Sequence, residues 1–160
     1  MKTFSLSLSF LFTLLLILPT TKHATAQHQN EKKIKREVIF TDKAMKPVGP
    51  YSQAIRAGDF IFVAGQGASS PTTGVLVEGG IKEQTRQVLR NIQSILEAAG
   101  SNLERVVKVT VFLSDWKYFK EMNEAFAEFF KTNPPARSTV QGARWPEGHL
   151  VAMEAIALAR

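Results

Sequence analysis

From residue 37 onward, hydrophobic and polar positions follow two distinct periods, and each period predicts a different kind of element. Three stretches rich in β-branched and aromatic residues come first, one at 37–41 and two within 51–66. They predict three short strands, the last two joined by a turn at Gly58, because glycine adopts turn conformations without strain. The segment 67–80 is rich in turn-forming residues and is predicted to be a loop.

A helix is predicted after that loop, since apolar residues recur three and four positions apart and Gly100 stands where a helix commonly ends. The stretch 105–115 then alternates between apolar and mixed positions, which predicts a half-buried strand. The apolar positions of the helix are Ile81, Val88, Leu89, Ile92, Ile95, Leu96 and Ala99. The predicted inner face of the strand consists of Val107, Val109, Val111 and Leu113, and Lys108, Thr110 and Phe112 form its outer face.

Asp115 can cap a second helix over 116–130, because its carboxylate accepts hydrogen bonds from the first backbone N–H groups. This helix carries an apolar stripe, which is interpreted as core rather than as a ligand site. The stripe consists of Phe119, Met122, Phe126, Phe129 and Phe130. Two further strands are predicted at 137–144 and 150–159.

The resulting order, β-β-β-α-β-α-β-β, predicts an α+β fold: a single mixed β-sheet with two helices packed on one face. The last strand adds a further expectation, because 150–159 is apolar at nearly every position. Both of its faces should be covered, one by the helices and the other by a second copy of the chain.

The first 26 residues are predicted to be a signal peptide, since Lys2 precedes an apolar run at 8–18 and small residues at 24–26 offer a cleavage site. The run is too short to span a bilayer, so no membrane span is expected in the mature chain. Residues 27–36 form a predicted polar linker, and the domain occupies 37–160. Export to the periplasm or the exterior follows; the alternative is a membrane anchor formed by an uncleaved leader.

Composition excludes several kinds of chemistry. The chain has no Cys, so disulfides and thiolate metal sites are excluded, and His149 is the only histidine in the predicted domain. His149 lies beside a turn and is expected at the surface, which argues against a His-based triad. No nucleotide-binding glycine motif is present. The formal net charge of +6 includes Lys2 and Lys22 of the leader, so it is weak support for a nucleic-acid partner. No metal or other cofactor is expected.

Arg137 stands where Pro134 and Pro135 give way to strand-forming residues. Taken alone, an arginine at the first residue of a strand is expected to face solvent.

Seven segments together resemble the RidA/YjgF family of 2-imino acid deaminases. They are GPYSQAI (49–55), FVAGQ (62–66), QTRQVLRNIQSILEAAG (84–100), VVKVTVFLSD (106–115), NEAFAEFF (123–130), PPARSTV (134–140) and EAIA (154–157), in the family's order and spacing. The resemblance covers the whole predicted domain. It implies the chorismate-mutase-like/YjgF fold and a homotrimer whose three sheets face inward as a barrel, with ligand sites between subunits.

The resemblance also implies a site. Arg137 would clamp the carboxylate of a small 2-imino acid through two hydrogen bonds. Tyr51 would close the pocket, Asn123 would add polar contacts, and Gly65 and the backbone at Thr139 would contact substrate or water. The implied reaction hydrolyses 2-iminopropanoate or 2-iminobutanoate to the 2-oxo acid and ammonia without a cofactor.

The sequence departs from the family pattern at the last strand. A glutamate that helps to orient the water in well-known family members corresponds to Ala152 here. A frequent serine is Ala64, and a frequent cysteine is Thr139. Glu154, two residues along the strand, either compensates as a catalytic group or is the family's second, structural glutamate. Deaminase activity is therefore expected to be weakened, since a lost general base costs roughly 10²–10⁴ in rate.

Two alternatives remain open. One is a non-catalytic protein of the same fold that binds small carboxylates or other metabolites, which the alanine at position 152 favours. The other is a ribonuclease or translation inhibitor, a role attributed to some family members; only the positive charge supports it.

Overall fold

The structure of the protein, a computed structural model, describes residues 35–142 and 148–159. Its strands are β1 (Arg36–Ile39), β2 (Ala54–Ala57), β3 (Phe60–Gln66), β4 (Val106–Leu113), β5 (Ala136–Gln141) and β6 (Val151–Leu158). Its helices are α1 (Ile81–Ala98) and α2 (Phe119–Phe129), with short 3₁₀ turns at Leu103–Arg105 and Trp116–Tyr118. The predicted order of strands and helices is confirmed.

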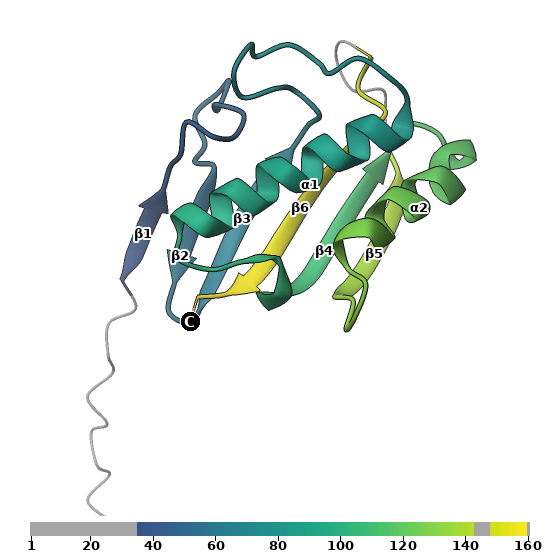
Figure 1. Ribbon diagram of the computed structural model, residues 1–160. Coiled ribbons are helices and arrows are strands. Elements are labelled where there is room, and N and C mark those ends of the chain that lie inside the picture. Colours follow the sequence, from purple (N-terminus) through teal and green to yellow (C-terminus); the bar gives the residue numbers. More distant parts are fainter. Residues whose placement is uncertain (1–34, 143–147, 160) are drawn as a thin grey trace, which may run out of the picture. The chain divides into compact units, whose positions relative to one another are not determined.

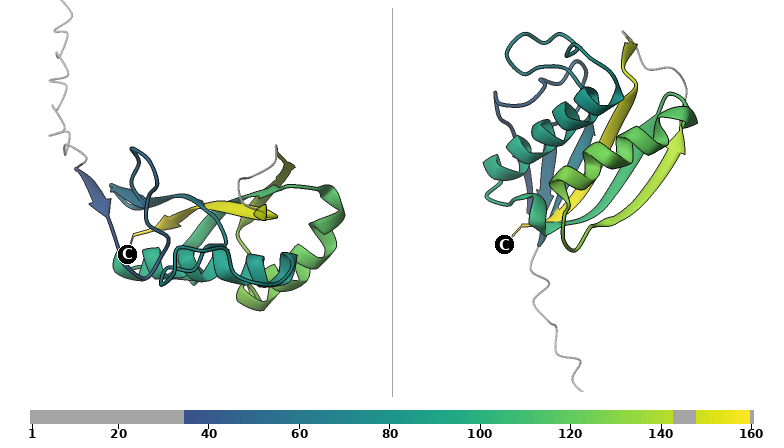
Figure 2. Two further views of the ribbon diagram at one scale, coloured as in Figure 1. Left: turned by 90° about the horizontal axis from the view of Figure 1, so that it is seen from above. Right: turned by 45° about the vertical axis from the view of Figure 1, so that its right-hand side comes forward.

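The six strands form one mixed sheet in the order β1-β2-β3-β6-β4-β5. Neighbours are antiparallel except for β4 and β5, which are parallel and are therefore connected by a crossover through α2. Both helices lie on the same face of the sheet, α1 across its middle and α2 along the edge that β4 and β5 form (Figures 1 and 2). The predicted α+β class, with two helices on one face, is confirmed.

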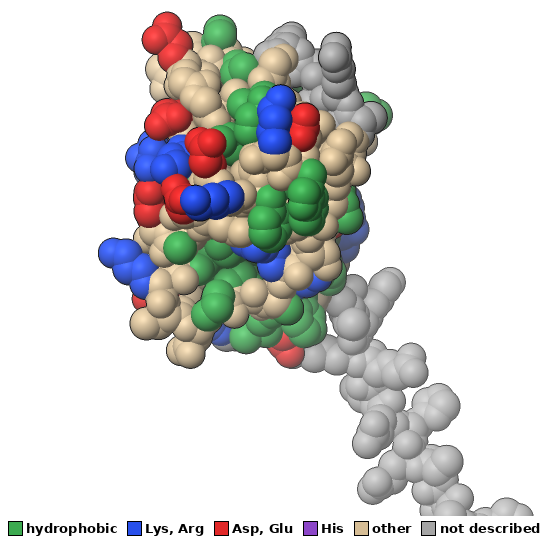
Figure 3. Space-filling model, turned by 90° about the vertical axis from the view of Figure 1, so that its right-hand side faces the viewer, with side chains coloured by type: hydrophobic (Ala, Val, Ile, Leu, Met, Phe, Trp, Pro, Cys, Tyr) green, Lys and Arg blue, Asp and Glu red, His purple; other side chains and the backbone are tan. Residues whose placement is uncertain are grey.

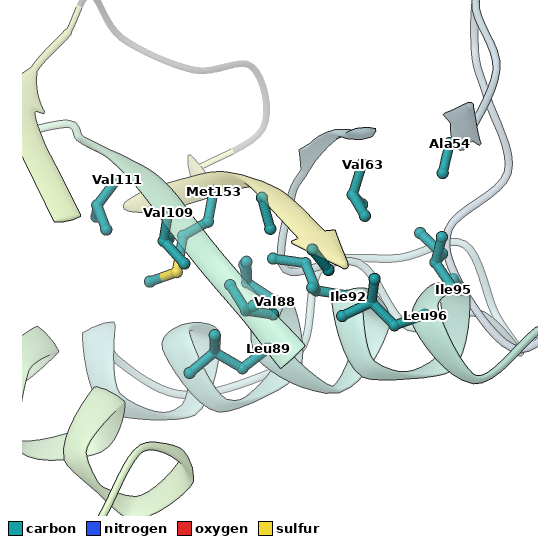
Figure 4. Close-up of a cluster of buried hydrophobic side chains, with 14 of the residues drawn as sticks. Ala54, Val63, Val88, Leu89, Ile92, Ile95, Leu96, Val109, Val111 and Met153 are labelled. Atoms are coloured by element: carbon teal, nitrogen blue, oxygen red, sulfur yellow. The ribbon is translucent and has the colours of Figure 1, made fainter. Parts of the chain in front are cut away.

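The main core lies between α1 and the sheet (Figure 4). Apolar side chains of α1 point toward side chains of β3, β4 and β6, and all of them are buried. Burial of each large apolar side chain contributes about 1.5–3 kcal/mol, so this layer is a main source of the hydrophobic stabilisation. The contacting residues include Val88, Leu89, Ile92, Ile95 and Leu96 from the helix and Val63, Val109, Val111 and Met153 from the sheet.

Gly100 ends α1 as predicted. Its φ of 72° is left-handed, and its N–H donates to the Glu97 carbonyl at 2.9 Å. The N–H of Ser101 donates to the Leu96 carbonyl at 2.8 Å. This pair of hydrogen bonds satisfies two carbonyls that the end of the helix would otherwise leave free.

The predicted alternation of β4 fails at its start. The register between β4 and β6 shifts between Val106 and Lys108, so one extra residue enters β4 there. As a result Val106 is buried at 6% exposed, whereas Val107, predicted on the inner face, is 38% exposed. From Val109 to Leu113 the alternation holds.

The second face of the sheet, which we call the open face, carries exposed apolar side chains. Val38, Ile55, Phe62 and Ile156 lie side by side in one row across β1, β2, β3 and β6. Phe62 is 45% exposed. Within the described residues of one chain, β6 is therefore covered by helices on one face only, and the predicted cover for its second face requires a further molecule.

The bounds of several elements differ from the predictions by a few residues. The second helix begins with a 3₁₀ turn, and β5 ends at Gln141, before the predicted limit of 144. Residues 143–147, and the predicted signal peptide with nearly all of the linker (1–34), lie outside the described residues. No helix within 35–142 and 148–159 is long and apolar enough to cross a membrane.

Candidate functional site

Arg137 lies near the start of β5, on the side of the sheet that α2 covers. Its register partner in the parallel pair is Val109, a buried residue whose side chain faces the helices. The Arg137 guanidinium carbon lies 4.8 Å from the centre of the Phe126 ring and 5.9 Å from the centre of the Phe119 ring. Both rings belong to α2, so this arginine is held against the helix instead of extending freely into solvent.

No carboxylate in the part of the chain that the structure describes pairs with the Arg137 guanidinium. Within 35–142 and 148–159 it forms neither a hydrogen bond nor an ion pair, and its contacts are the two ring faces. Partial burial lowers the pKa of this guanidinium, which costs hydration without supplying a counter-charge. Arg86 shows the contrast, since Glu128 binds it through two hydrogen bonds of 2.6 and 2.8 Å. Arg137 is therefore available for an anion.

Asn123 extends this region on α2. It lies four residues after Phe119 and three before Phe126, which places all three side chains on one face of the helix. Its Oδ1 atom is buried and accepts no hydrogen bond in the structure. Thr139, two residues after Arg137, lies on the same side of β5. We call Arg137, Thr139 and Asn123, with the two rings, the arginine half-site.

The side of the molecule that carries α2 and the β5 edge presents hydrophobic side chains next to those of Lys and Arg (Figure 3). One basic residue of α1 near this surface, Lys82, is already paired. Lys82 lies 2.6 Å from a Glu124 carboxylate oxygen, and this contact raises the Lys82 pKa.

Gly65 and Tyr51 lie elsewhere in the chain. Gly65 is in β3, and two strands, β6 and β4, separate β3 from β5, a distance of roughly 14 Å at the usual strand spacing. The β3–β6 register shifts between Val63 and Gln66, and a Cβ added at Gly65 would meet nothing within 4 Å, so packing within the chain does not require glycine there. Tyr51 is 43% exposed, and its hydroxyl accepts a 3.2 Å hydrogen bond from the Val48 N–H. One chain does not bring these two residues to Arg137.

Glu154 lies on the opposite face of the sheet from Arg137. It pairs with Thr110 on the open face, is exposed, and lines a hollow of about 180 Å³ with Lys108 and Phe62. Ala152 lies two residues earlier on the same face and is buried. The proposed compensation of Ala152 by Glu154 at an Arg137-bound ligand is therefore not formed within one chain.

Sequence reasoning missed three buried amides that hold the loops in place. Gln53 accepts a hydrogen bond from the Thr41 N–H at 2.7 Å and donates to the Met45 carbonyl at 2.9 Å. Asn91 of α1 donates to the carbonyls of residues 67 and 69, and Gln84 accepts from the N–H of residue 150. The sequence did contain a sign of two of these buried amides, because Gln84 and Asn91 lie on the apolar face of their helix.

The sequence predicted that His149 is a surface residue, but the structure shows it partly buried. Its ring is half-buried, lies against Gly67 and accepts a 3.2 Å hydrogen bond at Nδ1 from the Ala68 N–H. Only the tertiary fold brings these positions together, since about 80 residues of chain separate them.

The fold and the arginine half-site define a small α+β protein with a candidate anion site beside a paired helix and edge strand. The family model described as Endoribonuclease L-PSP matches residues 41–159, and the chain belongs to this family, the RidA/YjgF family. The resemblance noted from the sequence motifs is confirmed.

Individual relatives support the same family assignment. The chain is 57% identical to a RutC family protein of Pyrococcus horikoshii over 76% of this chain and 97% of that protein. It is 43% identical to human 2-iminobutanoate/2-iminopropanoate deaminase over 77% of this chain and 90% of the human protein. Among solved structures, Escherichia coli TdcF with bound serine has a TM-score of 0.73 and 35% identity, covering 76% of this chain and 98% of that one.

These relatives correct the prediction for the N-terminus. The Pyrococcus horikoshii protein is matched over 97% of its length by 122 residues of this chain, so it has no counterpart of a 26-residue leader. Nothing in the comparisons or in the described residues supports a signal peptide at 1–26, and that prediction is wrong. Neither the comparisons nor the described residues test the predicted export.

Proposed function

We propose that the protein hydrolyses small 2-imino acids, such as 2-iminopropanoate and 2-iminobutanoate, to 2-oxo acids and ammonia. The observation that carries this proposal is the half-buried Arg137 guanidinium, which has no acid partner within the described residues. A carboxylate is the natural counter-ion for such a group, because its two oxygens match the guanidinium fork. The human relative is named for this reaction, and the TdcF structure holds serine, itself a carboxylate.

The hydrolysis depends more on orienting the imine and a water molecule than on activating either of them. With the substrate carboxylate on Arg137, the adjacent C=N carbon is held within the half-site. A water oxygen adds to that carbon and one water proton goes to the nitrogen, which gives a carbinolamine. The hydroxyl proton then moves to the nitrogen as the C–N bond breaks, so that ammonia leaves and the C=O bond forms. The buried Oδ1 of Asn123 can accept a hydrogen bond from the imine N–H, and the backbone at Thr139 can hold the water.

We propose that a homotrimer completes the site. Gly65 lies in β3 and Tyr51 in the loop before β2, on the half of the chain away from β5, and the open face presents a row of apolar side chains. Packing that face against other copies would bury the row and bring the Tyr51 side of one chain to the arginine half-site of its neighbour. Within that assembly, Glu154 would come to the site from the open face.

A second candidate function is carboxylate binding without turnover. It is favoured by Ala152, which supplies no proton acceptor where family deaminases carry a glutamate, and by the position of Glu154 on the opposite face from Arg137. Such a protein would retain the arginine half-site and bind 2-oxo or 2-imino acids at equilibrium.

A coupled assay separates the two. 2-Iminopropanoate is generated in the cuvette by an amino acid oxidase, and its decay is followed with and without the protein. Turnover above the buffer rate is expected in the wild type. It should be lost in Arg137→Ala and largely lost in Arg137→Lys, because an ammonium cannot reproduce the two-point contact. Arg90→Ala, which removes an exposed arginine of α1, is the matched control.

The outcomes are distinct. Ala152→Glu should raise the rate if the missing glutamate limits turnover. Pyruvate binding without turnover in both the wild type and Ala152→Glu would replace the enzyme with the binding protein. Equal pyruvate affinity in the wild type and Arg137→Ala would show that neither proposal is correct.

A further inference from the structure

We infer that Phe126 and Phe119 are positioning residues for Arg137, and that carboxylate affinity depends on their aromatic faces as well as on the arginine charge. The inference rests on the proposed carboxylate site and extends it to residues that the sequence assigned only to the core.

The guanidinium lies within contact distance of both rings, with its carbon 4.8 Å from the Phe126 centroid and 5.9 Å from that of Phe119. Attraction between a cation and a ring face operates at separations up to about 6 Å. Phe119 and Phe126 are seven residues apart, so they occupy the same face of α2 two turns apart. The arginine thus lies across two successive turns of a rigid element.

Other aromatic side chains immobilise the two rings. Phe119 stacks on Trp116 with a centroid distance of 4.7 Å and an angle of 15°. Phe126 packs on Phe130 at 4.6 Å and is only 5% exposed. We call these four rings and Arg137 the aromatic column. Phe126 and Phe130 belong to the core at one end, and at the other end the backbone N–H of Trp116 donates to the Gln141 side chain of β5 at 3.2 Å.

This arrangement suits an arginine that must bind an anion. A salt bridge to a carboxylate would orient the guanidinium but would also occupy the N–H groups that a substrate needs. Contact with a ring occupies no acceptor, so the N–H groups of the guanidinium need not be used up by a protein partner. Because an arginine side chain has high rotamer entropy, holding it in place before the ligand arrives reduces the entropic cost of binding.

The competing explanation is that Phe126 only fills the core. The two explanations differ in what a replacement must preserve. A structural role requires apolar volume, which leucine largely supplies. A positioning role requires a ring face, which tyrosine supplies and leucine does not.

The test measures pyruvate affinity by isothermal titration calorimetry, and KM and kcat in the coupled imine assay, for wild type, Phe126→Leu and Phe126→Tyr. Phe126→Leu is expected to weaken pyruvate binding roughly three- to tenfold and to raise KM with little change in kcat. Phe126→Tyr should bind within about twofold of wild type. Met122→Leu, a conservative change in the core of the same helix, is the control and should leave affinity unchanged.

NMR of the arginine Nε–H groups adds a second measurement, the chemical shift of Arg137. This shift would not change if Phe126 only filled the core. The Arg137 signal, assigned by its loss in Arg137→Lys, is expected at a position shifted by the ring currents. It should move toward the signals of exposed arginines in Phe126→Leu, without ligand, and stay in place in Phe126→Tyr. If Phe126→Leu does not assemble, Phe119→Leu replaces it, because Phe119 is only partly buried.

Wild-type affinity and an unmoved Arg137 signal in a folded Phe126→Leu variant, with binding lost in Arg137→Ala, would overturn this inference and leave the proposed function intact. Unchanged binding in Arg137→Ala would instead overturn the carboxylate site, and the positioning role with it.

Discussion

Asn123→Leu should make the protein more stable and a poorer binder at the same time. The Asn123 Oδ1 atom is buried without a hydrogen-bond partner, a condition that costs about 1–3 kcal/mol. Leucine has the same branched shape and the same number of side-chain heavy atoms, removes the unsatisfied acceptor and favours the helix slightly more. Because the asparagine side chain is only half-buried, the lower part of that range applies, and the free energy of unfolding should rise by about 1 kcal/mol.

The effect on binding has the opposite sign. If Oδ1 accepts a hydrogen bond from the ligand, its loss removes about 0.5–1.5 kcal/mol, a two- to tenfold weaker affinity. A suitable ligand for this comparison is one that carries an N–H group, such as serine or alanine, with pyruvate as the ligand that lacks one. Affinity for the amino acid should fall while affinity for pyruvate changes little.

Stability is measured by urea unfolding, followed by circular dichroism at one fixed protein concentration, because assembly makes the midpoint depend on concentration. Asn123→Asp is the companion variant. Its carboxylate would lie on the Arg137 side of α2, so it should pair with the guanidinium and compete with every carboxylate ligand. A loss of stability in Asn123→Leu together with unchanged amino acid affinity would refute the reasoning.

Two further predictions concern assembly and pH. Phe62→Glu places a charge in the apolar row of the open face, so light scattering at micromolar concentration should find monomers and imine turnover should disappear. The control variant Val75→Glu, in a loop, should assemble normally. If Phe62→Glu is still a trimer, the interface lies elsewhere. The Asp115 carboxylate accepts a 2.9 Å hydrogen bond from the Lys117 backbone N–H, and this hydrogen bond lowers the pKa of Asp115. The stabilisation by this hydrogen bond is present above the ordinary pKa of an unfolded aspartate and is lost as the pH falls through the lower pKa of the folded state. Asp115→Asn should therefore flatten the fall of the melting temperature between about pH 5 and pH 2, and an unchanged profile would show that this cap does not titrate with folding.

What the sequence by itself determined about this protein is mostly local. The order of strands and helices, the end of α1 at Gly100 and the cap at Asp115 were predicted, because periodicity, a left-handed glycine and a capping carboxylate act within a few residues. Seven segments in order, one of them around Arg137, also identified the family, which the match over 41–159 confirms.

Only the tertiary structure decided where the side chains of the site point. Arg137 faces α2 because its backbone is in register with Val109, 28 positions earlier, and no local pattern encodes that register. The bulge at Val107 and the hydrogen bond from Ala68 to His149 likewise depend on partners distant in the chain. The same cause places Glu154 on the opposite face from Arg137, and it makes two rings of a predicted core stripe the immediate neighbours of the arginine. A strand's two faces become distinct only when its neighbours are set, so residues that a motif names together need not meet within one chain.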